Sequence, residues 1–216
     1  MIKPGFDAIA PIYDFLSALV FGPKLRQAQK IYLAQIPPTA TILILGGGTG
    51  WLLKEICLKV PASRIVYVEA SSKMLQLSKK RIAGLASAAP VEFRLGTEKN
   101  IEPTEKFEVI ITPFVLDLFP PAELNNMCRV LYNCLQPGGQ WLITDFVKPA
   151  SNGIWSPGQK ILLKSMYTFF RLVSRIRAAT LPDWEKSLLH FDLYPQKSTY
   201  FYRGMIKSVL YQKAKL

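Results

Sequence analysis

Residues 41–50 read Thr-Ile-Leu-Ile-Leu-Gly-Gly-Gly-Thr-Gly, and this stretch decides the fold. Its apolar half, Ile42 to Leu45, has the branched composition of a strand that is buried on both faces. Glycines at 46, 48 and 50 interrupt the strand, and residues 51–58 continue with helical spacing. A strand that turns through glycines into a helix directs its backbone N–H groups at one small ligand. The stretch therefore predicts a ligand-binding turn.

The spacing of these glycines narrows the choice of ligand. A dinucleotide-binding turn has the pattern G-x-G-x-x-G, with its last glycine at the start of the helix. A phosphate-binding P-loop needs Gly-Lys followed by Ser or Thr. This chain has G-x-G-x-G from Gly46 to Gly50 and no such lysine. The alternative is an ordinary glycine turn between a strand and a helix, without a ligand.

Strands and helices alternate with short connections through the middle of the chain. The pattern predicts strands at 42–45, 64–69, 91–95, 107–111 and 140–146, a turn at 137–139, and helices at 51–60, 73–82 and 121–135. Helices are also expected within 6–36, broken at 22–23, at about 159–179, and from 182–184. The last two strands are predicted at 193–202 and 205–212, the second antiparallel at the far side of the sheet. Such alternation predicts a doubly wound α/β fold with helices on both faces of a mostly parallel sheet.

The segment from Ile42 to Gly50 resembles motif I of the class I S-adenosylmethionine-dependent methyltransferases. In that family the glycine turn passes under the methionine and ribose of the cofactor, and an acid stands where this chain has Ile44. Residues 68–75 resemble the segment that follows motif I, residues 107–119 resemble motif IV, and residues 131–143 resemble the helix, turn and strand of motif VI. Residues 6–14 are similar to the opening of ubiquinone/menaquinone biosynthesis methyltransferases.

This resemblance implies a Rossmann-like, seven-stranded mixed sheet with an antiparallel last strand. It also predicts one methyltransferase domain over residues 1–216, with a helical cap at 1–38, a cofactor-binding core at 39–148, and C-terminal helices and strands at 149–216. S-adenosylmethionine is the implied cofactor. The residues expected to bind it are Leu45, Gly46, Gly47, Gly48, Thr49, Gly50, Glu69, Ala70, Ser71, Met74, Gly96, Thr97, Glu98, Thr112, Pro113, Phe114 and Tyr13.

Glu69 is the strongest of these predictions. It ends a predicted strand 19 positions after Gly50, and a carboxylate there can accept hydrogen bonds from both ribose hydroxyls. Thr97 stands where the family has an aspartate that binds the adenine amino group, and Glu98 follows one position later. The family places Thr112, Pro113 and Phe114 beside the methionine part of the cofactor.

The catalytic residues are less defined by the pattern. Asp117, His190 and Tyr13 are candidates for a base or an orienting group, although each also fits a structural role. Methyl transfer from a sulfonium chiefly needs alignment in a water-poor pocket, and a base only where the nucleophile arrives protonated. No metal-ligand spacing is present, so the reaction is expected to be metal-independent. A dinucleotide-dependent oxidoreductase and a non-catalytic S-adenosylmethionine-binding protein are the alternatives.

The composition restricts the partners. The net charge is +12, and it is uneven, since residues 151–216 hold 11 basic residues against 3 acidic ones. That basic third fits an anionic substrate, a nucleic acid, a membrane surface, or only solvent. The aromatic side chains favour a small apolar acceptor, with nucleic acid as the rival. Three cysteines without metal spacing fit reduced buried thiols, and no spanning helix or signal peptide is evident, so we expect a cytoplasmic protein. The oligomeric state stays open.

Overall fold

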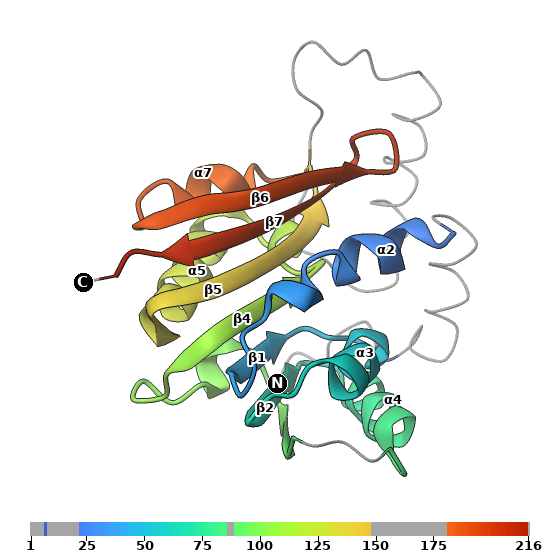
Figure 1. Ribbon diagram of the computed structural model, residues 1–216. Coiled ribbons are helices and arrows are strands. Elements are labelled where there is room, and N and C mark those ends of the chain that lie inside the picture. The colour runs from blue at the N-terminus through green and yellow to red at the C-terminus, as the bar shows by residue number, and fades with distance from the viewer. Residues whose placement is uncertain (1–6, 8–21, 86–88, 148–180, 216) are drawn as a thin grey trace.

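A computed structural model describes residue 7 and residues 22–85, 89–147 and 181–215. Within these residues one seven-stranded sheet has the strand order β3-β2-β1-β4-β5-β7-β6 (Figure 1). The strands are β1 (Thr41–Leu45), β2 (Arg64–Glu69), β3 (Val91–Leu95), β4 (Phe107–Pro113), β5 (Leu135–Phe146), β6 (Leu193–Phe201) and β7 (Ile206–Lys213). The neighbours from β3 to β5 pair in parallel, and β7 is antiparallel to both β5 and β6. The predicted mixed sheet is confirmed.

Helices alternate with the strands, as the sequence pattern predicted. They are α2 (Lys24–Lys30), α3 (Trp51–Lys59), α4 (Ser72–Ile82), α5 (Pro121–Cys134) and α7 (Trp184–Leu188), with short 3-10 turns η2 (Leu33–Gln35), η3 (Glu98–Asn100) and η4 (Leu116–Leu118). The helix expected over 24–36 is shorter: α2 ends at Lys30, and the 3-10 turn η2 follows it. Apart from Asp7, the expected helices within 6–21 and at 159–179 lie outside the described residues.

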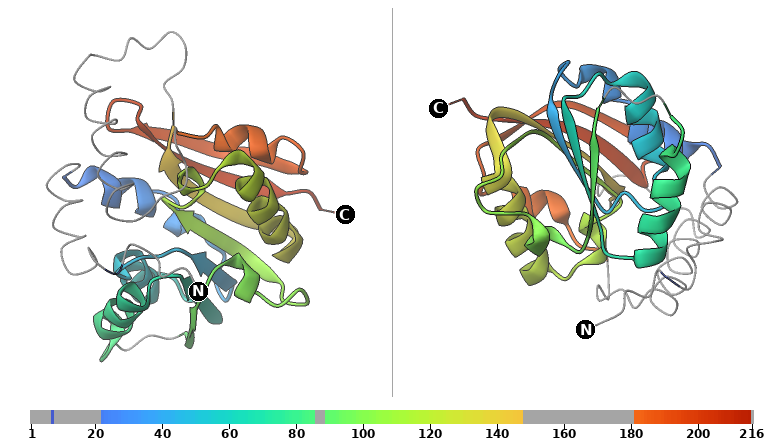
Figure 2. Two further views of the ribbon diagram at one scale, coloured as in Figure 1. Left: turned by 180° about the vertical axis from the view of Figure 1, so that it is seen from behind. Right: turned by 90° about the horizontal axis from the view of Figure 1, so that it is seen from below.

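The two faces of the sheet are covered by different helices (Figure 2). On β1, Leu43 and Leu45 belong to the core shared with α5 and α7, whereas Ile42 and Ile44 belong to the core shared with α3 and η2. Successive side chains of a strand point to opposite faces, so a continuous apolar run supplies both cores. This explains why residues 42–45 show no alternation with polar residues.

One local expectation was wrong. Residues 137–139 were expected to form a turn before the fifth strand, but β5 includes them, with a register shift opposite Phe107 and Val109. Gly138 has a φ of 74° there, and a side chain at Gly139 would lie 2.7 Å from Leu135, so the glycines form an irregular part of the strand. The antiparallel strand expected at the far side of the sheet is present as β7, and β6 pairs with it at the edge.

The strand order reverses between β1 and β4, which are neighbours although two strands separate them in the chain. In open α/β sheets, ligands bind at such a reversal, beyond the carboxyl ends of the strands. Residues 46–50 follow β1 at this edge. Among the described residues no helix combines the length and the apolar character needed to cross a membrane.

Candidate functional site

The glycine turn after β1 is closely packed against protein at some of its glycines and open at Gly48. Gly46, Gly48 and Gly50 have φ values of 69°, 64° and 80°, which side-chain-bearing residues rarely adopt. A Cβ at Gly46 would lie 2.4 Å from Val115, and one at Gly50 would lie 2.6 Å from Ser78. A Cβ at Gly48 would meet no atom within 4 Å. The turn therefore packs tightly against protein while Gly48 faces open space.

The carboxylate of Glu69 holds this turn from the neighbouring strand. Its Oε2 accepts a hydrogen bond of 2.9 Å from the backbone N–H of Gly48, and its Oε1 accepts one of 2.9 Å from that of Ser71. Burial raises the pKa of this carboxyl group, while the backbone donors act in the opposite direction. Each carboxylate oxygen can accept more than one hydrogen bond, so Glu69 retains capacity for a ligand's hydroxyl groups.

Tyr67, also on β2, holds the same turn. The sequence analysis did not select this residue. Its hydroxyl donates a hydrogen bond of 2.8 Å to the carbonyl oxygen of Gly48, and a Cβ at Gly47 would lie 2.4 Å from its ring. Tyr67 is the register partner of Ile44 on β1, the position where the family carries an acid. This pairing depends on the register of two strands, so no local sequence pattern indicated it.

A pocket opens beside the turn, between α2 and the end of β4. Its described lining consists of Leu25, Arg26, Gln29, Gly46, Gly47, Gly48, Thr49, Trp51, Leu52, Pro113 and Phe114. Phe114 has a φ of 57°, and its ring lies 5.2 Å from that of Phe146, centroid to centroid. Thr112, predicted beside the ligand, is instead fully buried, and its Oγ1 accepts a hydrogen bond of 3.1 Å from the Trp141 indole. Thr112 thus belongs to the core beneath the pocket.

The beginning of α4 lies beside Glu69 and is capped twice. The Ser71 hydroxyl accepts a hydrogen bond of 3.2 Å from the N–H of Met74, which satisfies one donor of the first turn. Asp7 accepts hydrogen bonds from Ser71 Oγ, from Ser72 Oγ and from the backbone of Lys73. The predicted residues Ser71 and Met74 are both buried. Asp7, which the sequence analysis did not select, thus binds the beginning of α4.

The turn after β3 is organised by its own side chains. The backbone N–H of Gly96 donates a 2.9 Å hydrogen bond to the carbonyl of Glu69, which holds this turn next to β2. Thr97 begins η3 as its cap, and its backbone N–H donates to Asn100 Oδ1 at 3.0 Å. The Thr97 hydroxyl thus accepts a hydrogen bond as the cap of η3, and Glu98 is the first residue of η3.

Asp117 is buried, and this environment does not suit the exchange of a proton with solvent. It lies in η4, and its carboxyl group interacts with that of Asp145, which is fully buried at the end of β5. Asp145 Oδ2 accepts hydrogen bonds from the N–H groups of Val115 (3.2 Å) and Leu116 (2.8 Å). Burial, and then the neighbouring Asp117, raise the pKa of Asp145 well above its ordinary value. The pair fixes the loop that follows Phe114.

His190 lies far from the glycine turn in the fold. It is exposed and precedes β6, whose first residue Leu193 pairs with Lys213 at the level where β5 begins. This is the amino-terminal edge of the parallel strands, opposite the edge that holds residues 46–50. The structure therefore argues against His190 as a catalytic base at the glycine turn. Tyr13, the third candidate, lies outside the described residues.

Among the described residues no group of three His, Cys, Asp or Glu side chains could hold a metal ion. All three cysteines are buried, as the sequence analysis predicted.

Comparison with known proteins agrees with this geometry. Residues 42–139 match the family described as a methyltransferase domain. The chain is 26% identical over 175 residues to the ubiquinone/menaquinone biosynthesis C-methyltransferase UbiE of Geotalea daltonii, covering 79% of this chain and 70% of that protein. It is 29% identical over 152 residues to UbiE of Ectopseudomonas mendocina, covering 68% of this chain but only 58% of that relative.

Solved structures share the fold. The complex between the Haloferax volcanii Trm112 methyltransferase activator and a methyltransferase gives a TM-score of 0.71 at 12% identity, covering 99% of this chain and 100% of that one. The N-methyltransferase NodS of Bradyrhizobium japonicum, in complex with S-adenosyl-L-homocysteine, gives a TM-score of 0.63 at 10% identity over 88% of this chain and 85% of that one.

Proposed function

We propose that this chain, which belongs to the class I S-adenosylmethionine-dependent methyltransferases, transfers a methyl group from that cofactor to a small apolar acceptor. The observation that carries the proposal is the junction of Glu69 with the glycine turn. A buried carboxylate and an open Gly48 meet at the carboxyl ends of β1 and β2. The cofactor-binding residues remain part of this proposal, with the exception of Thr112.

The residues present fit the cofactor. Glu69 would accept hydrogen bonds from the ribose hydroxyls, because it lies beside the turn and is already oriented by two backbone N–H groups. Gly48 leaves room for the ligand next to the backbone, where any larger residue would project into the pocket. S-adenosylmethionine supplies, when bound, a methyl group already activated by its positively charged sulfur. The protein is therefore required to bind, align and exclude water.

Phe114 is proposed to lie nearest the transferred methyl group. It lines the pocket, and its backbone N–H donates a 2.7 Å hydrogen bond to Thr144, which fixes the residue at its unusual φ. An aromatic face attracts a cationic centre and excludes water. Beneath it, Asp145 holds the next two backbone N–H groups, so the position of Phe114 is determined by the fold.

The apolar surroundings of Phe114 favour a small apolar acceptor. Phe114 and Phe201 pack against a cluster that includes Leu25, Phe146 and Ile206 at this edge of the sheet. The UbiE relatives are C-methyltransferases of ubiquinone and menaquinone biosynthesis, and an acceptor of similar aromatic character suits this site. Methyl transfer without a metal, by alignment alone, is the proposed mechanism.

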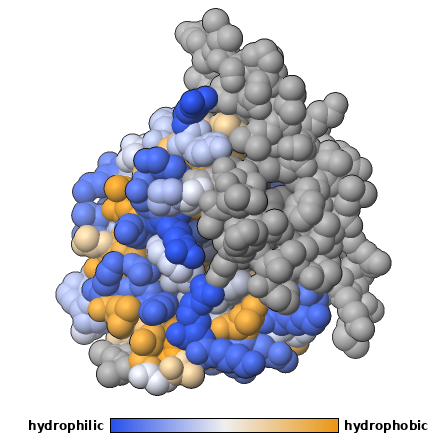
Figure 3. Space-filling view, turned by 90° about the vertical axis from the view of Figure 1, so that its right-hand side faces the viewer, coloured by the Kyte–Doolittle hydropathy of each residue, from blue (hydrophilic) through white to orange (hydrophobic). Residues whose placement is uncertain are grey.

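The structure offers less support for the other partners. On the face shown in Figure 3, the described surface is mainly hydrophilic, and its apolar side chains lie in scattered spots. Much of the basic C-terminal third lies outside the described residues. Nucleic-acid binding, membrane-surface contact and a cytoplasmic location therefore stay predictions, as does the division into a cap at 1–38, a core at 39–148 and a C-terminal part at 149–216.

Calorimetric titration with S-adenosylhomocysteine tests the cofactor site. The wild-type chain should bind this product. Glu69→Gln should weaken the binding by about tenfold or more, because a charge-assisted hydrogen-bond acceptor is lost. Glu55→Gln is the matched control, since Glu55 pairs with Lys59 on α3 and does not line the pocket. Tight binding of NAD without binding of S-adenosylhomocysteine would contradict the proposal and favour an oxidoreductase.

A methyl-transfer screen then tests the acceptor. Quinones, phenols, small amines and RNA should be offered with labelled S-adenosylmethionine, and we expect label in a quinone or phenol. Label in RNA alone would contradict the proposed acceptor class. Cofactor binding without transfer to any of these acceptors would favour the non-catalytic alternative.

A further inference from the structure

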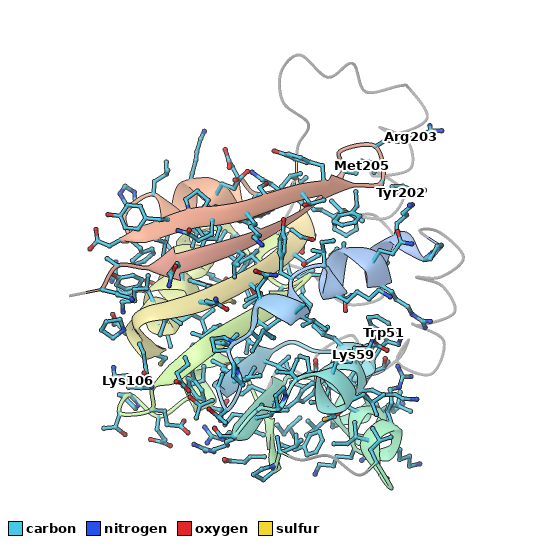
Figure 4. The ribbon with its side chains drawn as sticks, viewed as in Figure 1. Trp51, Lys59, Lys106, Tyr202, Arg203 and Met205 are labelled. Atoms are coloured by element: carbon cyan, nitrogen blue, oxygen red, sulfur yellow. The ribbon has the colours of Figure 1, made fainter. Side chains whose placement is uncertain are left out.

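Helix α2 contributes one wall of the pocket beside the glycine turn. Leu25, Arg26 and Gln29 line it from this helix, and Trp51 lines it from the start of α3. The guanidinium carbon of Arg26 lies 5.1 Å from the centroid of the Trp51 ring, and Trp51 projects from α3 into the space next to α2 (Figure 4). The indole thus supports the guanidinium group at the rim of the pocket.

This wall is positively polarised. Among the described residues that line the pocket none is acidic, and among the described carboxylates none forms an ion pair with Arg26. Helix α3 begins at the same place, with no side-chain cap and no acidic residue in its first turn. The N-terminal end of a helix favours an anion, and a guanidinium group presents a planar fork that matches a carboxylate.

Glu69 and this wall contact the same glycine turn from two separate elements, β2 and α2. Glu69 is not part of the pocket lining, whereas Gly46, Gly47, Gly48 and Thr49 are. The ribose is the middle part of S-adenosylmethionine, with the adenine on one side of it and the amino-acid part on the other. When the ribose is at Glu69 and the adenine is at the turn after β3, the amino-acid part is left to extend across the glycine turn toward α2. This amino-acid part carries one carboxylate.

We propose that Arg26 on its Trp51 support, assisted by Gln29, recognises the carboxylate of the cofactor's amino-acid part. This inference rests on the proposed function and adds to that function a residue that determines ligand specificity. Arg26 would distinguish ligands with an amino-acid part from adenosine thioethers that lack one.

Titration with two ligands tests this assignment. S-adenosylhomocysteine has the carboxylate, and 5′-methylthioadenosine has the adenosine and sulfur without it. Arg26→Gln should weaken the binding of S-adenosylhomocysteine by about tenfold and change the affinity for 5′-methylthioadenosine less than twofold. Only S-adenosylhomocysteine would lose a charge-assisted hydrogen bond. Arg26→Lys should give an intermediate loss, since it keeps the charge and loses the fork.

Lys30→Gln is the matched control, because Lys30 is an exposed cation of the same helix and lies outside the pocket lining. Unchanged binding of S-adenosylhomocysteine to Arg26→Gln would overturn the assignment. An equal loss for both ligands would also overturn it, by showing that Arg26 acts through its packing on Trp51. Failure of the wild-type chain to bind S-adenosylhomocysteine would instead contradict the proposed function, and this inference with it.

Discussion

The hydroxyl of Tyr67 donates a hydrogen bond of 2.8 Å to the carbonyl oxygen of Gly48. Glu69, two residues further along the same strand, accepts a hydrogen bond from the backbone N–H of Gly48. Both polar groups of this one glycine are therefore bound from β2. Ile44, where the family has an acid, is buried next to Tyr67 and cannot form such a bond. Tyr67 therefore holds the turn by a hydrogen bond that the apolar side chain of Ile44 cannot form.

Tyr67→Phe should weaken both the fold and the cofactor site. The variant keeps the ring and its edge-on contact with Phe93 but removes the hydrogen bond to Gly48. We expect a loss of about 1 kcal/mol in the free energy of unfolding, and a severalfold weaker binding of S-adenosylhomocysteine. Urea denaturation and calorimetry measure the two effects. Unchanged affinity in a destabilised variant would show that Glu69 alone orders the turn.

Gly50→Ala should be much more harmful than Gly84→Ala. The two glycines have nearly equal φ values, 80° and 81°, so the left-handed backbone costs each alanine about 1–2 kcal/mol. A Cβ at Gly50 would also lie 2.7 Å from the Cα of Ser78, whereas a Cβ at Gly84 meets nothing within 4 Å. The difference in the free energy of unfolding between the two variants, measured by denaturation, therefore reports the crowding of the turn against α4. Equal losses would show that α4 can move away.

Asp117→Asn should flatten the dependence of stability on pH. In the native protein the pKa of Asp145 is raised by burial and by Asp117, so the folded state binds a proton more tightly than the unfolded chain. The free energy of unfolding must then fall as the pH rises from the unfolded pKa through the higher folded one. Each unit between those two pKa values corresponds to about 1.4 kcal/mol.

In the asparagine variant the amide can donate to Asp145, which removes the repulsion between the two carboxylates. Urea denaturation between acid and neutral pH checks this, and Asp183→Asn, at an exposed aspartate, is the control. A variant curve parallel to that of the wild type would mean that Asp117 does not govern the proton on Asp145.

Cys128 should react with thiol reagents only when the protein unfolds. Its side chain is fully buried, and burial raises its pKa to about 12. The thiolate is the reactive form, so alkylation of the native protein near pH 8 should be far slower than in urea. Mass spectrometry of iodoacetamide-treated protein measures this. Rapid labelling of Cys128 in the native state would indicate that α5 opens from the sheet.

The sequence determined the order of the elements and the cofactor turn. Apolar runs such as 42–45 and the glycine spacing at 46–50 are local patterns, and local patterns specify strands and turns directly. The identification of Glu69 also follows from the sequence, because a residue that ends the strand after the turn must lie at the same sheet edge.

Only the tertiary structure decided which side chains share the site. Tyr67 and Ile44 are 23 positions apart, and Asp117 and Asp145 are 28 apart, so their contacts depend on strand register and on the loop after β4. The same holds for Thr112, which the strand directs into the core, and for Arg26, which α2 brings to the turn. Contacts between distant segments arise from packing of the whole sheet and its helices, and no local pattern encodes them.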